Sequence, residues 1–191
     1  LMASLKADAS QIAKYSPLEG WSHEGEEQCG MHINCCNANG PRAFAMIPQF
    51  AYQVQDDCVR VNFYAPSEAE LVLPGKKPVR LKQTTDYPQT DQIEVDPAKE
   101  TAFTIALRIP AWSKIAVVSV NGQPQDGVLQ GAYLPVNRKW KKGDRITVKL
   151  DLRARLVERN QAQAIVRGPV VLARDSRFGD GFVDEASVVV S

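Results

Sequence analysis

The stretch Ile146-Thr-Val-Lys-Leu-Asp-Leu152 decides the fold class, because its apolar and polar residues alternate without interruption. An alternation of period two places the apolar side chains on one face of a strand and the polar ones on the other. The same pattern recurs in residues 59–63 and in residues 103–109. These three stretches predict strands that bury one face each.

Shorter apolar stretches predict further strands, and turn residues separate them. The additional strands are expected at residues 69–73, 79–84, 92–95, 115–120, 132–136 and 164–173, with turn signals at Pro74-Gly75, Asp96-Pro97, Asn121-Gly122 and Lys142-Gly143-Asp144. Roughly eight to ten short strands at this spacing are typical of an antiparallel sandwich. The sequence therefore predicts a mainly β protein with a jelly-roll-like antiparallel β-sandwich.

The first 56 residues lack this alternation and favour helices. Residues 1–15 are rich in Ala, Leu, Lys and Gln, which are good helix formers, and Ser16-Pro17 ends the stretch. A second helix is predicted from Pro41, capped by Asn39, to about residue 54. Pro48 predicts a kink or an early break in that helix.

Composition excludes two classes of partner. The formal net charge is +1, so no basic surface exists that would recruit nucleic acid. No apolar run reaches the ~20 residues that a transmembrane helix needs. The longest such run, residues 168–173, fits a buried strand.

Residues 1–6 do not resemble a signal peptide, and Leu1 does not look like a natural start, so we expect the N-terminus to be a cut.

The densest group of metal-binding residue types is Cys29-x-x-His32-x-x-Cys35-Cys36. Thiolate and imidazole are the ligands that zinc prefers, and four of them can close a tetrahedral site. The alternative is that one or two of these cysteines are small buried hydrophobic residues, as we expect for Cys58 before its strand. Cys35 and Cys36 also precede the predicted helix start, where the helix dipole lowers the pKa of a thiol.

The segment His32-Ile-Asn-Cys35-Cys36-Asn-Ala-Asn39-Gly-Pro-Arg42 resembles the double-cysteine segment of the bacterial β-L-arabinofuranosidases of glycoside hydrolase family 127. Later stretches resemble the C-terminal region of the same family in the same order. They are residues 107–112, 120–122, 133–140, 143–144 and 168–172. The resemblance covers most of the chain, from about residue 30 to residue 173.

The resemblance implies an (α/α)6 barrel followed by β-sandwich domains. On that basis residues 1–56 hold one or two residual barrel helices and the cysteine-rich loop, residues 57–175 the sandwich, and residues 176–191 a tail or additional strand. Most of the barrel lies outside the chain and would be its partner. The resemblance further implies a periplasmic or extracellular protein, while a cytoplasmic one stays open.

The resemblance also assigns chemistry to residues. Cys35 would be the nucleophile of a retaining glycoside hydrolase and a zinc ligand, and Cys36 would be a zinc ligand. Cys29 and His32 are further candidate ligands, as is a nearby glutamate. The substrate would be a carbohydrate that contains L-arabinofuranose. The acid/base glutamate would come from the barrel, so we expect the isolated chain to be inactive.

Two alternatives remain. A non-catalytic carbohydrate-binding module would present Trp112 or Trp140 on an open sheet face, where the ring stacks on a sugar. A purely structural domain would use an apolar patch near Phe44, Ile47 and Phe50, which predicts self-association when the barrel is absent.

Overall fold

The structure is a computed structural model that describes residues 3–5, 12–14, 35–76, 78–97, 101–159 and 162–172, with side-chain detail from Arg42 onward. The chain divides into two compact units. One consists of residues 1–45 and 172–191, and the other of residues 46–171. The predicted domain limits at residues 56 and 175 stay predictions.

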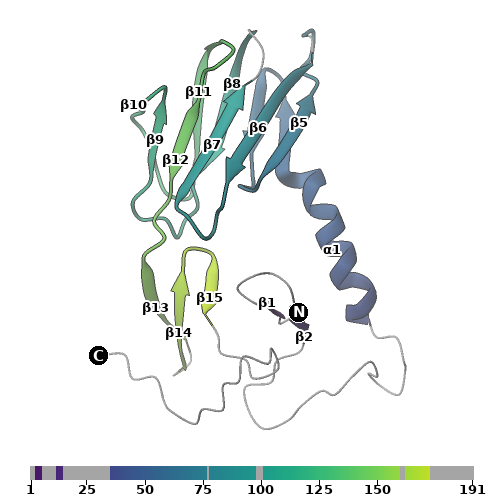
Figure 1. Cartoon of the computed structure of the whole chain (residues 1–191), viewed down its shortest axis with the longest axis vertical. Coiled ribbons are helices and arrows are strands. Elements are labelled where there is room, and N and C mark those ends of the chain that lie inside the picture. The colour runs from purple at the N-terminus through teal and green to yellow at the C-terminus, as the bar shows by residue number, and fades with distance from the viewer. Residues whose placement is uncertain are drawn as a thin grey trace. The chain divides into compact units, whose positions relative to one another are not determined.

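Residues 46–171 contain a six-stranded antiparallel sheet, which forms one layer of a β-sandwich (Figure 1). Its order is β10 (Gln123–Pro124), β9 (Val117–Val120), β12 (Ile146–Lys149), β7 (Gln92–Pro97), β6 (Val79–Thr85) and β5 (Ser67–Leu71). The alternation read in the sequence is visible in β6, where buried and exposed residues alternate over all seven positions. The central strands of this sheet therefore lie where the sequence predicts them.

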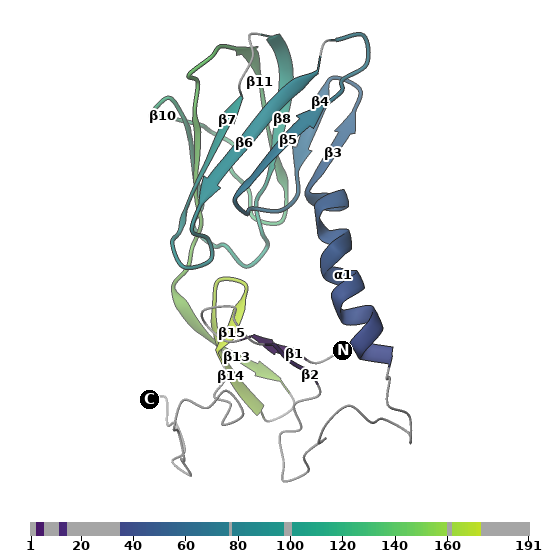
Figure 2. The ribbon, with the colours of Figure 1, turned by 45° about the vertical axis from the view of Figure 1, so that its right-hand side comes forward.

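The second layer is a four-stranded sheet of order β11 (Tyr133–Trp140), β8 (Thr101–Arg108), β4 (Cys58–Val61) and β3 (Tyr52–Gln55). Figure 2 shows the two sheets as separate layers. The β4–β8 pair is parallel, with Cys58 opposite Thr104, and the other neighbours in this sheet are antiparallel. The predicted sandwich is confirmed, with this one parallel pair added.

The core lies between the two sheets and consists of the side chains at every second position of the strands. Val59, Ile105 and Trp140 come from the four-stranded sheet, and Leu81 and Ile146 from the six-stranded sheet, and all five are fully buried. Burying a side chain of this size contributes about 1.5–3 kcal/mol. The period-two pattern thus supplies the apolar surface that holds the layers together.

Helix α1 (Cys35–Ala51) leads directly into β3. It starts six residues before the predicted Pro41 and continues through Pro48, so the expected early break does not occur. It ends before the predicted residue 54, because Tyr52 and Val54 turn inward and pair with β4 as a strand. Asn62 satisfies the end of the helix: its side-chain amide donates to the Phe50 carbonyl at 2.9 Å, and its backbone N–H donates to the Ala51 carbonyl at 2.9 Å.

A three-stranded sheet follows the sandwich and comprises β13 (Ala154–Arg159), β14 (Ala162–Arg167) and β15 (Val170–Leu172). The single strand predicted at residues 164–173 is instead two strands, because Gly168 adopts φ +57° and turns the chain. The prediction of a buried strand at residues 168–173 is also wrong, since residues 170–172 are exposed. Arg167 ties this sheet to the sandwich by donating to the carbonyls of Pro88 and Gln89 at 3.0 and 3.2 Å.

The N-terminal residues form strands where a helix was expected. β1 (Ala3–Leu5) and β2 (Ile12–Lys14) pair antiparallel, with Ala3 opposite Lys14. The predicted helix over residues 1–15 is therefore wrong, because helix propensity is a weak preference that strand pairing overrides. Among the described residues, no helix is long and apolar enough to cross a membrane. The predicted tail at residues 176–191 lies outside the described residues.

Candidate functional site

The predicted nucleophile, Cys35, and its neighbour Cys36 are the first two residues of α1. Backbone N–H groups in the first turn of a helix have no acceptor within the helix, and they give its N-terminus a partial positive charge. The first turn contains no acidic residue. The backbone therefore places both cysteines at the helix start itself, where a negatively charged sulfur is favoured, whereas the sequence predicted that they precede it.

The other two members of the predicted metal cluster, Cys29 and His32, lie outside the described residues, and so do the glutamates near them. Within the described part of the chain, no group of three or more His, Cys, Asp or Glu residues could hold a metal ion. The donor chemistry of Cys35 and Cys36 still fits zinc, because two thiolates are half of a tetrahedral site. The zinc prediction thus depends on these two residues and on further ligands that the described residues do not supply.

Cys58, the fourth cysteine, has a different environment. It begins β4, is partly buried and is not in a disulfide. Burial raises the pKa of its thiol above the usual range, and the nearby Arg60 only partly opposes this. At neutral pH the side chain is therefore a protonated thiol, which suits a structural role rather than nucleophilic chemistry.

The two tryptophans considered for stacking on a sugar do not form an exposed platform. Trp140 is fully buried, and its indole N–H donates to the Phe103 carbonyl at 2.9 Å. Trp112 is partly buried against the core, and the guanidinium carbon of Arg155 lies 6.0 Å from its ring centroid. These positions favour packing, so they do not support the module that binds sugar through exposed tryptophans.

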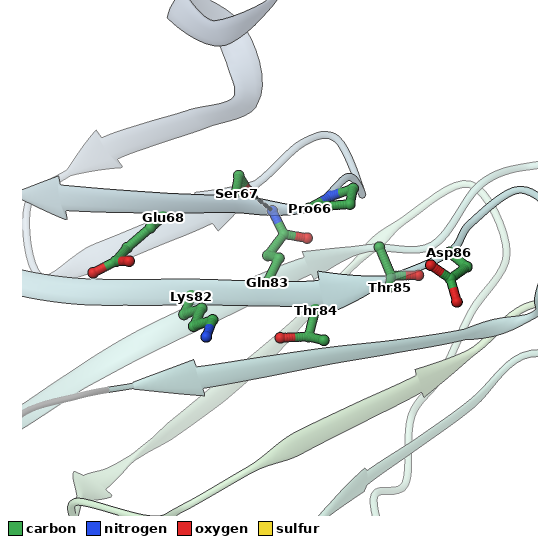
Figure 3. Close-up of a pocket in the computed structure, with 8 residues that line it drawn as sticks. All are labelled: Pro66, Ser67, Glu68, Lys82, Gln83, Thr84, Thr85 and Asp86. Atoms are coloured by element: carbon green, nitrogen blue, oxygen red, sulfur yellow. Dashed lines mark hydrogen bonds between the residues drawn. The ribbon is translucent and has the colours of Figure 1, made fainter. Parts of the chain in front are cut away.

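The structure shows a notch between β5 and β6 that sequence reasoning missed. It has a volume of about 420 Å³ and is lined by residues 66–68 and 82–86 (Figure 3). Ser67, the first residue of β5, pairs with Gln83, whereas β6 continues to Thr85. Pro66 cannot donate a backbone hydrogen bond, so β5 does not extend alongside Thr84 and Thr85. The one signal in the sequence was Gln83, a polar residue at an inward position of β6.

A second groove, of about 660 Å³, is lined by residues 89–91, 115, 117, 149–153 and 167. Its two arginines are already engaged. Arg167 donates to backbone carbonyls, and Arg153 donates twice to the Asp151 carboxylate at 2.8 Å. This hydrogen bonding lowers the pKa of Asp151 to about 2. These contacts explain the local structure, and both arginines are already used within the chain.

The sandwich matches one protein family in sequence. The family model for the GH127 middle domain of β-L-arabinofuranosidase matches residues 58–152, which begin at the first residue of β4 and include every strand through β12. No curated protein matches the chain.

Several solved structures are similar to the chain, and three of them are described here. A GH127 β-arabinofuranosidase is 33% identical, with a TM-score of 0.67, over 74% of this chain and 26% of its own. A glycoside hydrolase is 28% identical, with a TM-score of 0.70, over 83% of this chain and 28% of its own. A GH127 β-L-arabinofuranosidase from Geobacillus stearothermophilus T6 is 26% identical, with a TM-score of 0.68, over 87% of this chain and 29% of its own.

The chain thus spans less than a third of the length of each structure that it matches. The matched region is the sandwich without β3, and β3 alone separates it from α1 and its two leading cysteines. The chain therefore belongs to glycoside hydrolase family 127, in which residues 58–152 form the middle domain.

Proposed function

We propose that this chain is part of a retaining glycoside hydrolase that acts on glycans containing L-arabinofuranose, and that Cys35 supplies the nucleophile. The observation that carries the proposal is positional: two adjacent cysteines begin the helix that leads, through β3, into the family 127 middle domain. The resemblance of residues 32–42 to the double-cysteine segment of that family supports the same assignment.

In the proposed reaction the Cys35 sulfur attacks the anomeric carbon of the sugar, forming a C–S bond as the bond to the leaving oxygen breaks. The leaving oxygen takes a proton from a carboxylic acid that the catalytic barrel provides. Water then attacks the same carbon, its proton returns to that carboxylate, and the sulfur leaves as a thiolate. Two inversions at one carbon give net retention of configuration.

The role of this chain's backbone is to favour the ionised sulfur. The unpaired N–H groups of the first turn of α1 stabilise negative charge at Cys35 before attack and after hydrolysis. Cys35 and Cys36 would together hold a zinc ion, with the remaining ligands coming from the barrel or from Cys29 and His32. A bound zinc would keep the sulfur deprotonated at neutral pH.

The test uses the protein that carries these 191 residues together with a catalytic barrel, assayed with an aryl β-L-arabinofuranoside. Cys35→Ala should lower kcat by roughly a thousandfold or more, because it removes the nucleophile. Cys36→Ser should also lose the zinc, which elemental analysis should find at about one per chain in the unmodified protein. Cys58→Ser is the matched control and should retain both zinc and activity.

Two outcomes would contradict the proposal. Near-normal turnover by Cys35→Ala would remove the nucleophile from this chain, and full zinc occupancy in Cys36→Ser would remove the metal site. The isolated 191-residue chain should release no sugar, because it lacks the acid/base that contributes about 10²–10⁴-fold to such reactions.

A further inference from the structure

The outer face of the four-stranded sheet, which is turned away from the six-stranded sheet (Figure 2), carries cations and no acids. Strands β3, β4, β8 and β11 contain no Asp or Glu, whereas β5 and β7 of the other sheet contain two each. Val61 and Leu107 are buried in the core, so the side chains of their neighbours Arg60 and Arg108 point outward. The net charge of +1 gives no sign of this separation, because it sums the charges of both sheets.

Tyr133 joins these two arginines into one group. It lies directly opposite Arg108 in the register of β11 and β8, and the guanidinium carbon of Arg60 lies 5.8 Å from its ring centroid. The Tyr133 hydroxyl donates to Asn62 Oδ1 at 2.6 Å. Arg60 also donates to Gln53 Oε1 at 3.5 Å. These contacts and the strand register place all five residues on one face of the sheet.

Neither guanidinium on this face has a carboxylate partner among the described residues, and that of Arg108 forms no hydrogen bond there either. The carboxylate of Asp57, in the turn before β4, pairs with Lys76. The other three arginines of the sandwich each pair with a carboxylate, at 3.3, 3.7 and 3.1 Å for Arg80, Arg138 and Arg145. The outer face of the four-stranded sheet therefore offers two neighbouring cations that an anion from outside the chain would pair.

We propose that this face binds an acidic polysaccharide, in which carboxylates of uronic acid residues pair with Arg60 and Arg108. A guanidinium matches a carboxylate with two parallel N–H···O hydrogen bonds. Uncharged groups on the same face can bind sugar hydroxyls. Among the described residues, the Gln55 side chain, Gln53 Nε2 and Asn137 Oδ1 have no partner.

The composition of the face favours a polysaccharide over an acidic protein. No Leu, Ile, Val, Met or Phe side chain points outward from these four strands, all of which the structure describes. The face therefore lacks the apolar centre that is typical of protein interfaces. The choice of a glycan also rests on the proposed function, whereas the negative charge of the ligand rests on the face alone.

The test is isothermal titration calorimetry of the complete protein, which carries these 191 residues and a catalytic barrel, with tetragalacturonate. Binding should weaken as the salt concentration rises, because the contacts are ionic and exposed. The methyl ester of the same tetramer should bind about tenfold more weakly or worse, because its carboxylates are neutralised.

The double variant Arg60→Gln/Arg108→Gln should weaken binding by about tenfold or more. Arg80→Gln/Arg145→Gln is the matched control, because it removes the same charge from exposed positions of the other sheet, and it should bind normally. Should the first double variant be unstable, Arg108→Gln alone decides, because its guanidinium makes no hydrogen bond or ion pair among the described residues. That variant should weaken binding by about threefold or more.

Absence of tetragalacturonate binding, or equal weakening in the two double variants, would overturn the proposal. Tetraglutamate and inorganic tripolyphosphate are anions without a sugar, so equally tight binding of either would overturn the assignment to a glycan. Hydrolysis of the aryl β-L-arabinofuranoside by the Cys35 variants reports on the proposed function separately, because that substrate has no carboxylate. Failure of one proposal can therefore be told from failure of the other.

Discussion

At the scale of single residues, Asp144 joins two turns of the six-stranded sheet. One carboxylate oxygen accepts from the Asn121 side-chain amide at 2.8 Å, and the other accepts from the Lys141 N–H at 2.8 Å. Asn121 in turn accepts from the Arg145 N–H at 2.8 Å and adopts φ +52° in the turn before β10. Asp144 thus links the turn after β9 to the turn before β12.

Asp144 should make the stability of the fold depend on pH in the acid range. Its pKa is lowered mainly by the hydrogen bond from Asn121, and also by the Lys141 N–H. A lowered pKa in the folded state means that the stabilisation is complete above the unfolded pKa, about 3.9, and is lost as the pH falls through the folded value. Asp144→Asn should therefore lower the free energy of unfolding by about 1–2 kcal/mol at pH 7.

Urea unfolding between pH 2 and pH 7 measures this effect. The difference between wild type and Asp144→Asn should narrow as the pH falls below about 4. Asp126→Asn, on the exposed loop between β10 and β11, is the matched control and should leave the curve unchanged. If the difference in the free energy of unfolding stays constant between pH 2 and pH 7, the charge of the Asp144 carboxylate does not contribute to stability.

At the scale of elements, the turn between β14 and β15 depends on a glycine. Gly168 has φ +57°, and a Cβ there would lie 2.3 Å from Leu152 Cδ2, a side chain that is itself buried. Gly127 has φ +75° and nothing within 4 Å of such a Cβ. Gly168→Ala therefore adds overpacking to backbone strain, whereas Gly127→Ala adds strain alone.

Gly168→Ala should destabilise the chain more than Gly127→Ala does, by about 1–3 kcal/mol. Urea unfolding gives the difference in total stability. Hydrogen exchange should locate the additional loss in β14 and around Leu152, because the clash pushes these two apart. Equal losses in the two variants would mean that Leu152 moves aside at no cost.

The central strands were predictable because their signal is local. In β6, β8 and β12 each residue's side of the sheet follows from the residues beside it. Burial confirms the alternation in β6 and β12, whereas in β8 Ala106 is buried as well. β3 was not predictable, because Val54 continues the helical spacing of Ile47 and Ala51 and becomes a strand residue only by pairing with β4. The same holds for β1 and β2, which stabilise each other by pairing.

The two candidate sites also differ in how far the sequence alone reveals them. Cys35 and Cys36 are adjacent in the sequence and could be recognised there, although the cap expected at Asn39 set the helix start six residues late, at Pro41. The notch could not be predicted, because it depends on the register that places Ser67 opposite Gln83. The register of a hairpin depends on the type and length of the loop that joins its strands, which the alternation within either strand does not give.

At the scale of the whole molecule, α1 carries an apolar face that nothing in the described part of the chain covers. Phe44, Ile47 and Phe50 are 56%, 45% and 55% exposed, and their spacing of three residues places them on one side of the helix. We propose that the catalytic barrel covers this face in the complete protein. Without the barrel, a contiguous apolar surface promotes association between copies.

The isolated chain should therefore self-associate, and sedimentation velocity at increasing concentration should show it. The triple variant Phe44→Ser/Ile47→Ser/Phe50→Ser should remain monomeric, because the apolar face is gone. The control is the double variant Val72→Ser/Leu129→Ser, which changes two scattered apolar residues that are more exposed than those of α1. It should still associate. A wild-type chain that stays monomeric at every concentration would contradict this role for α1.

The most direct test of the central claim is to trap the covalent intermediate on the complete protein. An activated aryl β-L-arabinofuranoside is mixed with the enzyme, and the reaction is quenched with acid. The protein is then digested, and the masses of its peptides are measured by mass spectrometry. We expect one added pentosyl group on Cys35, and none in Cys35→Ala. An adduct on another residue, or rapid turnover with no adduct on the peptide that carries Cys35, would contradict it.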